Sequence, residues 1–198
     1  MRTQVGIIGA GPAGLLLSRL LQLQGIDTVV LENRSRDYVE ARIRAGILEQ
    51  HTVQTLRDAG VGDRLDREGL PHDGIYLQYP GTRHHLDFEE LCGRKVWVYG
   101  QTEVTKDLIQ AQLDDGPPLL FDVSDVTPED VDGDAPRIRF TDADGVPQVL
   151  ECDVIDGTDG FHGPSRAVVQ EAGGRAGNAP TPTPGSASWP TRRRPPTS

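Results

Sequence analysis

The first 31 residues contain two short apolar runs on either side of a longer, leucine-rich segment. The runs at 5–8 and 28–31 predict buried strands of a parallel sheet, since such strands are covered on both faces. Between them lies a segment whose leucines would cover most of the circumference of a helix. The segment stops near Gly25, and this predicts a helix with a glycine just beyond its end. A strand, a helix and a strand within about 30 residues predict one βαβ unit.

Apolar spacing predicts further helices and strands as far as residue 170. Helices are expected over 47–59 and 102–113, and strands over 96–99, 119–123, 137–141, 149–152 and 154–155. Residues 75–79 and 83–88 are expected to pair as a hairpin around Pro80-Gly81. In the second helix Thr102 is a candidate N-cap, and the side chains expected to face inward are Val104, Leu108, Ile109 and Leu113.

The composition changes sharply after residue 169. Residues 170–198 contain no Val, Ile, Leu, Met or Phe, but they contain six prolines and four glycines. So few apolar side chains cannot offset the entropy lost when a backbone becomes ordered, and we expect this segment to be a disordered tail. A natural tail or a flexible linker would have such a composition.

Charge and cysteine content exclude several classes of protein. The formal net charge of −10 argues against a nucleic-acid-binding surface. Cys92 and Cys152 lie far apart in no metal-ligand spacing, so no metal is expected, and two thiols indicate a reducing, cytoplasmic location. The apolar stretch at 5–17 is interrupted by glycines and a proline, whereas a spanning helix needs about 20 apolar residues. Neither a membrane span nor a targeting segment is therefore expected.

The glycine-rich loop at 9–14 reads Gly-Ala-Gly-Pro-Ala-Gly and separates the first expected strand from the expected helix. In a G-x-G-x-x-G loop the first glycine permits a tight turn, the second lets backbone amides approach a diphosphate, and the third lets the helix pack on the sheet. Glu32 follows the second strand, where a carboxylate can bind both ribose hydroxyls, and this favours FAD or NAD over NADP. The candidate cofactor-binding residues are Gly9, Gly11, Pro12, Ala13, Gly14 and Glu32.

Three later segments carry a resemblance to a known family. Residues 42–50 read Arg-Ile-Arg-Ala-Gly-Ile-Leu-Glu-Gln, residues 98–105 read Val-Tyr-Gly-Gln-Thr-Glu-Val-Thr, and residues 156–166 read Asp-Gly-Thr-Asp-Gly-Phe-His-Gly-Pro-Ser-Arg. With the glycine-rich loop, they resemble the 4-hydroxybenzoate 3-monooxygenase family of flavoprotein aromatic hydroxylases. The resemblance covers roughly residues 1–169. It implies an α/β fold: a Rossmann-like FAD-binding domain, incomplete, over 1–169, which includes a partial, β-rich segment of the substrate domain at 71–98.

The resemblance also implies cofactor contacts at matching positions. Arg44 and Gln101 would contact FAD, with the planar guanidinium of Arg44 directed toward the diphosphate. Arg42 would lie near the flavin and the nicotinamide nucleotide. Asp159 and Gly160 would bind the ribityl chain or the diphosphate.

The nicotinamide nucleotide would be bound by His162 and Arg166, again by resemblance. Tyr38 matches a position that influences nicotinamide preference in the family. Asn33 and Arg34 depart from the Arg-Gln pair of members that prefer NADPH, so the choice between NADH and NADPH stays open.

The family reaction uses FAD, NADPH or NADH, and O₂ to hydroxylate a small aromatic substrate, converting 4-hydroxybenzoate to 3,4-dihydroxybenzoate. In the family, the residues that hold the phenol follow the segment at 156–166, so no catalytic residue is named here. A flavoprotein hydroxylase of another phenol and a non-catalytic nucleotide-binding remnant are the alternatives. The resemblance also suggests a homodimer.

The tail has a second interpretation. GC-rich codons for Tyr-Pro-Tyr-Ala-Trp-Leu, which resembles the family's continuation, give Thr-Pro-Thr-Pro-Gly-Ser when read one base later, and residues 181–186 have that sequence. We therefore hypothesise that residues 170–198 result from a frameshift, either real or a sequencing error. A chain of this extent is expected to hydroxylate weakly or not at all.

Overall fold

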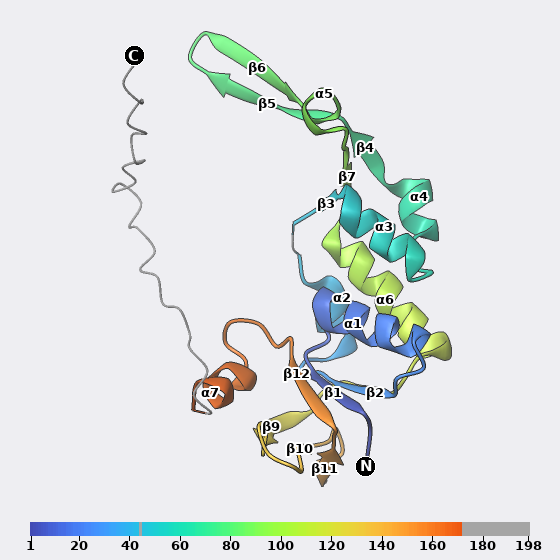
Figure 1. The fold of residues 1–198 in the computed structure, drawn as a ribbon, viewed down its shortest axis with the longest axis vertical. Coiled ribbons are helices and arrows are strands. Elements are labelled where there is room, and N and C mark those ends of the chain that lie inside the picture. The colour runs from blue at the N-terminus through green and yellow to red at the C-terminus, as the bar shows by residue number, and fades with distance from the viewer. Residues whose placement is uncertain (44, 172–198) are drawn as a thin grey trace, which may run out of the picture.

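A four-stranded parallel sheet lies at the centre of the computed structural model, which describes residues 1–43 and 45–171 (Figure 1). Its strands are arranged in the order β12-β1-β2-β8. Their bounds are Val5–Ile8 for β1, Thr28–Leu31 for β2, Leu119–Leu120 for β8 and Val154–Gly157 for β12. Helix α1 (Pro12–Leu23) connects β1 to β2, so the expected βαβ unit and the α/β class are confirmed.

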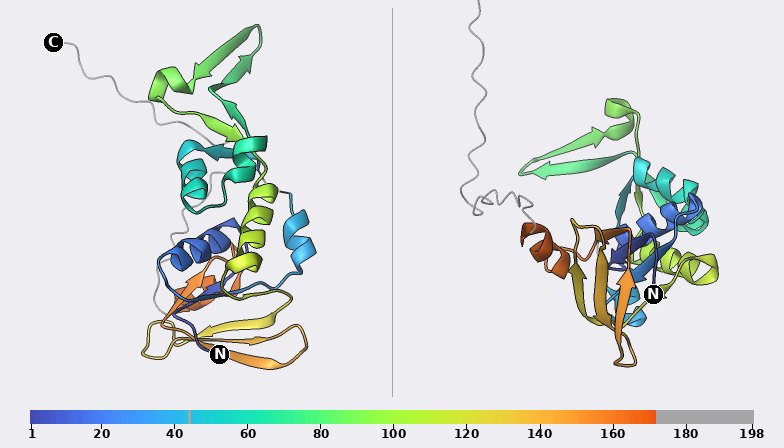
Figure 2. Two further views of the ribbon diagram at one scale, coloured as in Figure 1. Left: turned by 90° about the vertical axis from the view of Figure 1, so that its right-hand side faces the viewer. Right: turned by 60° about the horizontal axis from the view of Figure 1, so that its bottom comes forward.

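The sheet is covered on both faces, as a parallel sheet requires (Figures 1 and 2). Helices α1 and α6 (Gln101–Asp115) pack against each other on one face. The other face is covered by an antiparallel sheet of β9 (Ser124–Glu129), β10 (Arg137–Thr141) and β11 (Pro147–Glu151). Ile7 belongs to the apolar cluster on the helical side and Ile8 to the cluster that contains Ile138, because successive side chains on a strand point to opposite faces.

A second group of elements lies beyond α6, toward the top of Figure 1. It contains a small antiparallel sheet in the order β3-β7-β4, two helices and a hairpin with a short helix after it. The bounds are β3 (Ile47–Glu49), α3 (Gln50–Asp58), α4 (Asp63–Glu68), β4 (Leu70–His72), β5 (Gly74–Tyr79), β6 (Thr82–Asp87), α5 (Phe88–Cys92) and β7 (Val96–Val98). The expected hairpin is β5–β6, and it projects away from the central sheet with α5 beside it (Figure 2).

Two further helices, α2 (Arg36–Ala41) and α7 (Pro164–Glu171), follow β2 and β12 respectively. Within the described chain, no helix combines the length and the apolar character that crossing a membrane would require. The expected tail at 170–198 lies outside the described residues except for its first two positions, which end α7.

The structure corrects two expected boundaries. The helix expected over 47–59 begins only at Gln50, because Ile47–Glu49 pair with β7 as a strand. The strand expected over 119–123 ends at Leu120, and Asp122 then adopts a φ of 56°, which is outside the extended region.

Two expectations for α6 were also wrong. The N-cap is Gly100, while the Thr102 hydroxyl donates a hydrogen bond to the carbonyl oxygen of Arg42 at 3.2 Å. Leu113 is 47% exposed, because Gln112 takes the inward position in that turn. The Gln112 side-chain amide donates to the Ser18 hydroxyl at 3.0 Å and so joins α6 to α1.

Arg64 fastens α4 to α6 through a network of charged groups. Its guanidinium donates to the Asp107 carboxylate at 2.7 Å, to the Glu103 carboxylate, and to the Glu103 carbonyl oxygen at 3.0 Å. The Tyr99 hydroxyl donates to the other oxygen of Asp107 at 2.7 Å. Burial and this hydrogen bond raise the pKa of Tyr99 above its ordinary value, so Tyr99 stays a donor across the physiological range.

We predict that Arg64→Met lowers the free energy of unfolding by about 2 kcal/mol, since it leaves Asp107 without its charged donor and leaves Glu103 with Lys106 alone. Urea unfolding measures the change. Arg2→Met is the matched control, because the Arg2–Asp153 pair is exposed and should contribute less than about 1 kcal/mol. Equal losses from the two variants would contradict a structural role for the network.

Candidate dinucleotide-binding site

The loop between β1 and α1 turns within three residues. Gly9 has a φ of 109°, which is accessible to glycine and rarely adopted by other residues. Gly11 is the N-cap of α1, and Pro12 follows as its first helical residue, where the missing amide hydrogen leaves no hydrogen bond unmade. The start of a helix presents free backbone N–H groups and a partial positive charge, and such an end can bind an anion.

Two glycines of this loop are needed because neighbouring backbone lies too close for a side chain. A Cβ atom on Gly9 would lie 2.7 Å from the carbonyl oxygen of Thr158, and one on Gly14 would lie 2.1 Å from that of Gly9. Gly11 differs, since a Cβ there would have no atom of the described chain within 4 Å. The space beside Gly11 is open, so the loop fits a diphosphate that approaches the backbone of the second glycine.

Glu32 lies directly beside the loop, at the end of β2. The backbone N–H of Ala10 donates to its Oε2 at 2.8 Å, and the backbone N–H of Arg34 donates to its Oε1 at 2.9 Å. Each carboxylate oxygen therefore has one fixed donor and retains lone pairs for a further donor, such as a ribose hydroxyl. The structure thus brings the expected acidic residue and the glycine-rich loop together.

The segment after β12 lies against the same loop. β1 and β12 are parallel neighbours, so their carboxyl ends meet at one edge of the sheet. The backbone N–H of Thr158 donates to the carbonyl oxygen of Ile8 at 2.9 Å. Since β2 lies on one side of β1 and β12 on the other, this edge is a topological switch point, where open α/β sheets bind ligands.

Asp159 and Gly160 shape the turn that leads into α7. The Asp159 carboxylate accepts a hydrogen bond from the backbone N–H of Ser165 at 2.9 Å, and Gly160 has a φ of 77°. One oxygen of Asp159 therefore has a partner within the protein. Gly160 has open space where its Cβ would be, with no described atom within 4 Å.

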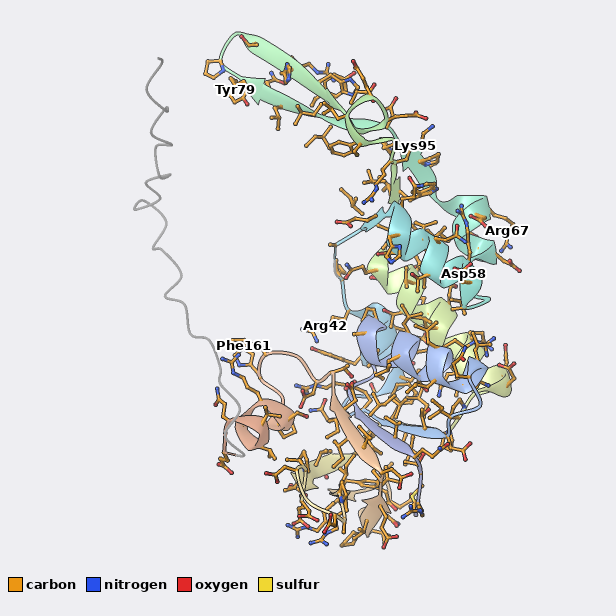
Figure 3. The ribbon with its side chains drawn as sticks, viewed as in Figure 1. Arg42, Asp58, Arg67, Tyr79, Lys95 and Phe161 are labelled. Carbon is orange, nitrogen blue, oxygen red and sulfur yellow. The ribbon has the colours of Figure 1, made fainter. Side chains whose placement is uncertain are left out.

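The aromatic ring of Phe161 connects the two residues expected to bind the nicotinamide nucleotide. The ring is 69% exposed on the loop before α7 (Figure 3). The Arg166 guanidinium carbon lies over its face at 4.2 Å from the centroid. The His162 ring is arranged T-shaped to it, with 5.0 Å between the two ring centroids. His162 and Arg166 are thus gathered around one ring.

Arg42 and Gln101 come from segments that are fastened together. The backbone N–H of Gln101 donates to the carbonyl oxygen of Ala45 at 3.0 Å, and the Thr102 hydroxyl bonds to Arg42 as described above. Figure 3 shows Arg42 on the segment after α2. Arg44 lies outside the described residues.

Sequence reasoning missed two residues at this edge, Thr158 and Asp156. Both lie within the segment 156–166, and the rule that ligands bind at the carboxyl ends of parallel strands could have singled them out. Thr158 contacts the loop through backbone and side chain, and Asp156 pairs with Ile7 across the sheet. No group of three or more His, Cys, Asp or Glu side chains suited to a metal ion occurs in residues 1–43 and 45–171.

Residues 2–182 match the family described as the FAD binding domain. The chain belongs to that family. The geometry of Gly11 and Glu32, at the carboxyl ends of β1 and β2, fits the cofactor for which this family is described.

Relatives of this FAD binding domain are aromatic hydroxylases. The chain is 48% identical over 172 residues to p-hydroxybenzoate hydroxylase of Acinetobacter baylyi, covering 86% of this chain and 42% of that enzyme. It is 30% identical to 3-(3-hydroxy-phenyl)propionate/3-hydroxycinnamic acid hydroxylase 2 of Burkholderia vietnamiensis, covering 85% of this chain and 31% of that enzyme. Among solved structures it resembles the anhydrotetracycline hydroxylase OxyS of Streptomyces rimosus, with a TM-score of 0.72 and 28% identity over 86% of this chain and 34% of that one. The chain thus spans less than half the length of the relatives that it matches.

Asp156 is an unusual carboxyl group beside this site. Its Oδ2 is buried and has no hydrogen-bond partner among the described residues. Burial, and then the nearby charge of Asp159, raise the pKa of Asp156 above its ordinary value. Because the folded state favours the protonated form, the wild-type chain loses stability as the pH rises through that raised pKa.

We predict that Asp156→Asn raises the melting temperature relative to the wild type at about pH 7 and that this gain shrinks as the pH falls toward about 4, because the raised pKa favours the protonated form of Asp156 in the folded state. Thermal unfolding across this pH range tests the idea. Asp132→Asn, at an exposed position, is the control and should show no such pH-dependent gain. A constant difference between Asp156→Asn and the wild type at every pH would contradict the prediction.

Proposed function

We propose that this chain binds FAD through the loop at 9–14 and Glu32, and that it is the FAD-binding part of an aromatic hydroxylase of the p-hydroxybenzoate type. The observation that carries the proposal is the open backbone at Gly11, at the start of α1, next to a carboxylate held by the Ala10 amide. Sequence identity of 48% to the Acinetobacter baylyi enzyme supports the substrate class. The reductant would be NADH or NADPH, and the oxidant O₂.

The proposed role of the loop is electrostatic. Backbone N–H groups at the start of α1 would donate to the diphosphate, whose negative charge suits this end of the helix. Pro12 and Ala13 lie in the first turn and carry no acidic side chain that would repel it. Glu32 would accept hydrogen bonds from the adenosine ribose, which selects against a 2′-phosphate at this position.

The remaining cofactor contacts are proposed from the resemblance. Gln101 and Arg44 would bind FAD from the α6 side, and Arg42 would lie between the flavin and the nicotinamide nucleotide. Asp159 and Gly160 would bind the ribityl chain or the diphosphate. His162 and Arg166 would bind NADH or NADPH.

Bound FAD would supply the redox chemistry: it would take a hydride from the nicotinamide and, once reduced, activate O₂ toward a phenol. The residues of this chain would bind and orient the cofactor. We assign no general acid or base within the described residues. Residues 1–169 would form the FAD-binding region, with 71–98 as its β-rich insertion.

The substrate is proposed from the similarity to two of the hydroxylases named above. We favour 4-hydroxybenzoate, and we expect the chain alone to hydroxylate weakly or not at all, because it matches only 42% of the Acinetobacter baylyi enzyme. A different phenol is the second candidate, favoured by the 30% identity to the Burkholderia vietnamiensis hydroxylase.

We predict that the purified chain binds FAD and that Gly11→Val weakens binding by about a hundredfold, because the new side chain fills the space for the diphosphate. The φ of Gly11 is −74°, so valine is compatible with the backbone, and the variant should stay folded with only the modest loss of stability that a poorer N-cap residue causes. Visible absorption of bound flavin and titration of flavin fluorescence measure the affinity.

Gly25→Ala, at the opposite end of α1, is the matched control. Its Cβ also meets open space, but the φ of 73° makes alanine unfavourable, so stability should fall by about 1 kcal/mol or more while FAD affinity stays unchanged. A Gly11→Val chain that binds FAD as tightly as the wild type would sink the proposed diphosphate site.

We predict that a hybrid, in which residues 1–169 replace the matching part of the Acinetobacter baylyi enzyme, converts 4-hydroxybenzoate to 3,4-dihydroxybenzoate. Product analysis by chromatography, with NADH and NADPH in parallel, tests the reaction and the nucleotide preference. The intact Acinetobacter baylyi enzyme is the control. The residues that hold the phenol would come from the Acinetobacter baylyi part, so the hybrid tests residues 1–169 as an FAD-binding part. A hybrid that folds but binds no FAD, or that binds FAD and hydroxylates no phenol, would contradict the assignment.

A further inference from the structure

Thr158 connects the two segments that meet at the proposed FAD site. Its hydroxyl lies 3.0 Å from the carbonyl oxygen of Ile8 and 3.2 Å from that of Gly9. Carbonyl oxygens only accept, so the hydroxyl donates to this pair. Its backbone N–H also donates to Ile8, at 2.9 Å, so one residue makes both a main-chain and a side-chain contact with the end of β1.

The backbone around Thr158 leaves little room for the loop at 9–14 and the turn after β12 to pack together in another way. A Cβ on Gly9 would lie 2.7 Å from the Thr158 carbonyl oxygen and 3.0 Å from the Asp159 Cα, so the two turns are in direct contact. A Cβ on Gly14 would lie 2.5 Å from the Thr158 hydroxyl oxygen. The first and third glycines of the loop thus make room for Thr158 as well as for the packing of helix on sheet.

We propose that Thr158 is a positioning residue, whose hydroxyl holds the loop at 9–14 against the Asp159-Gly160 turn before the cofactor binds. The proposal rests on the proposed function, since it concerns the affinity of this loop for FAD. A loop that is already ordered loses less conformational freedom when it binds a diphosphate, so its affinity is higher. Without the hydroxyl, the loop would lose one of the hydrogen bonds that order it before the cofactor binds.

The test compares four variants of the full chain. Thr158→Val removes the hydroxyl while keeping the shape, and Thr158→Ala and Thr158→Ser differ from each other by the hydroxyl alone. Thr3→Val is the matched control, because the Thr3 hydroxyl also donates to a backbone carbonyl, that of Asp27 at 2.9 Å, at the opposite end of the sheet. Fluorescence titration gives the Kd for FAD, and amide hydrogen exchange of the FAD-free chain gives the order of the loop.

The expected result has two parts. Thr158→Val and Thr158→Ala weaken FAD binding about tenfold, as the loss of one hydrogen bond would, and Thr158→Ser stays within about threefold of the wild type. In the FAD-free chain the same two variants speed exchange at the Gly9 and Ala10 amides, which bond to Leu31 and Glu32, while Thr3→Val affects only the other end of the sheet.

Equal affinity and equal exchange in Thr158→Ala and Thr158→Ser would overturn the proposal. So would a loss of FAD binding in Thr3→Val as large as that in Thr158→Val. Complete unfolding of both Thr158→Val and Thr158→Ala, seen by circular dichroism, would assign the hydroxyl to the stability of the whole sheet and also reject the positioning role. If the wild type binds no FAD but the exchange pattern appears, the proposed function fails while the ordering of the loop by Thr158 stands.

Discussion

The contact between two stretches of backbone, the loop after β1 and the turn after β12, is the constraint on which the site depends. Gly9 lies so close to Thr158 that a side chain at position 9 would overlap its carbonyl group. This contact is available only because β1 and β12 are parallel neighbours, so both chains leave the sheet at the same edge. The apolar clusters on the two faces of the sheet hold these strands in register and thereby maintain the contact.

The three glycines of the loop have different physical roles, and the structure separates them. Gly9 and Gly14 are surrounded by protein atoms, so they serve the packing of the loop, the helix and the β12 turn. Gly11 faces open space, so it serves whatever binds there. Glu32 adds the second half of the site, because its carboxylate is fixed by two backbone amides, those of Ala10 and Arg34.

The sequence predicted correctly those elements whose interacting residues are close together in the chain. It failed for elements whose hydrogen-bond partners are far away in the chain. The unit from β1 to Glu32 is short, and its apolar runs, glycines and acidic residue identified the fold and the loop correctly. Ile47–Glu49 has helical spacing but forms a strand, because β7 supplies a partner almost fifty residues away. The role of Thr158 depends on a contact across 150 residues of sequence, and the spacing of residues near it does not reveal such a contact.

The loop and Glu32, which are proposed to bind FAD, lie at one edge of the central sheet, so FAD binding and hydroxylation depend on different parts of the fold. The loop, Glu32 and Thr158 are positioned by β1, β2 and β12, which belong to one sheet, and by α1, which packs on it. The β5–β6 hairpin lies outside this sheet, with Ile75 and Tyr79 on a largely exposed face, and a two-stranded hairpin is at best marginally stable alone. Affinity for FAD should therefore depend on the central sheet, whereas the resemblance implies that the residues that hold the phenol follow the segment at 156–166. For that reason, loss of hydroxylation in this chain would not count against FAD binding, and the two properties have to be measured separately.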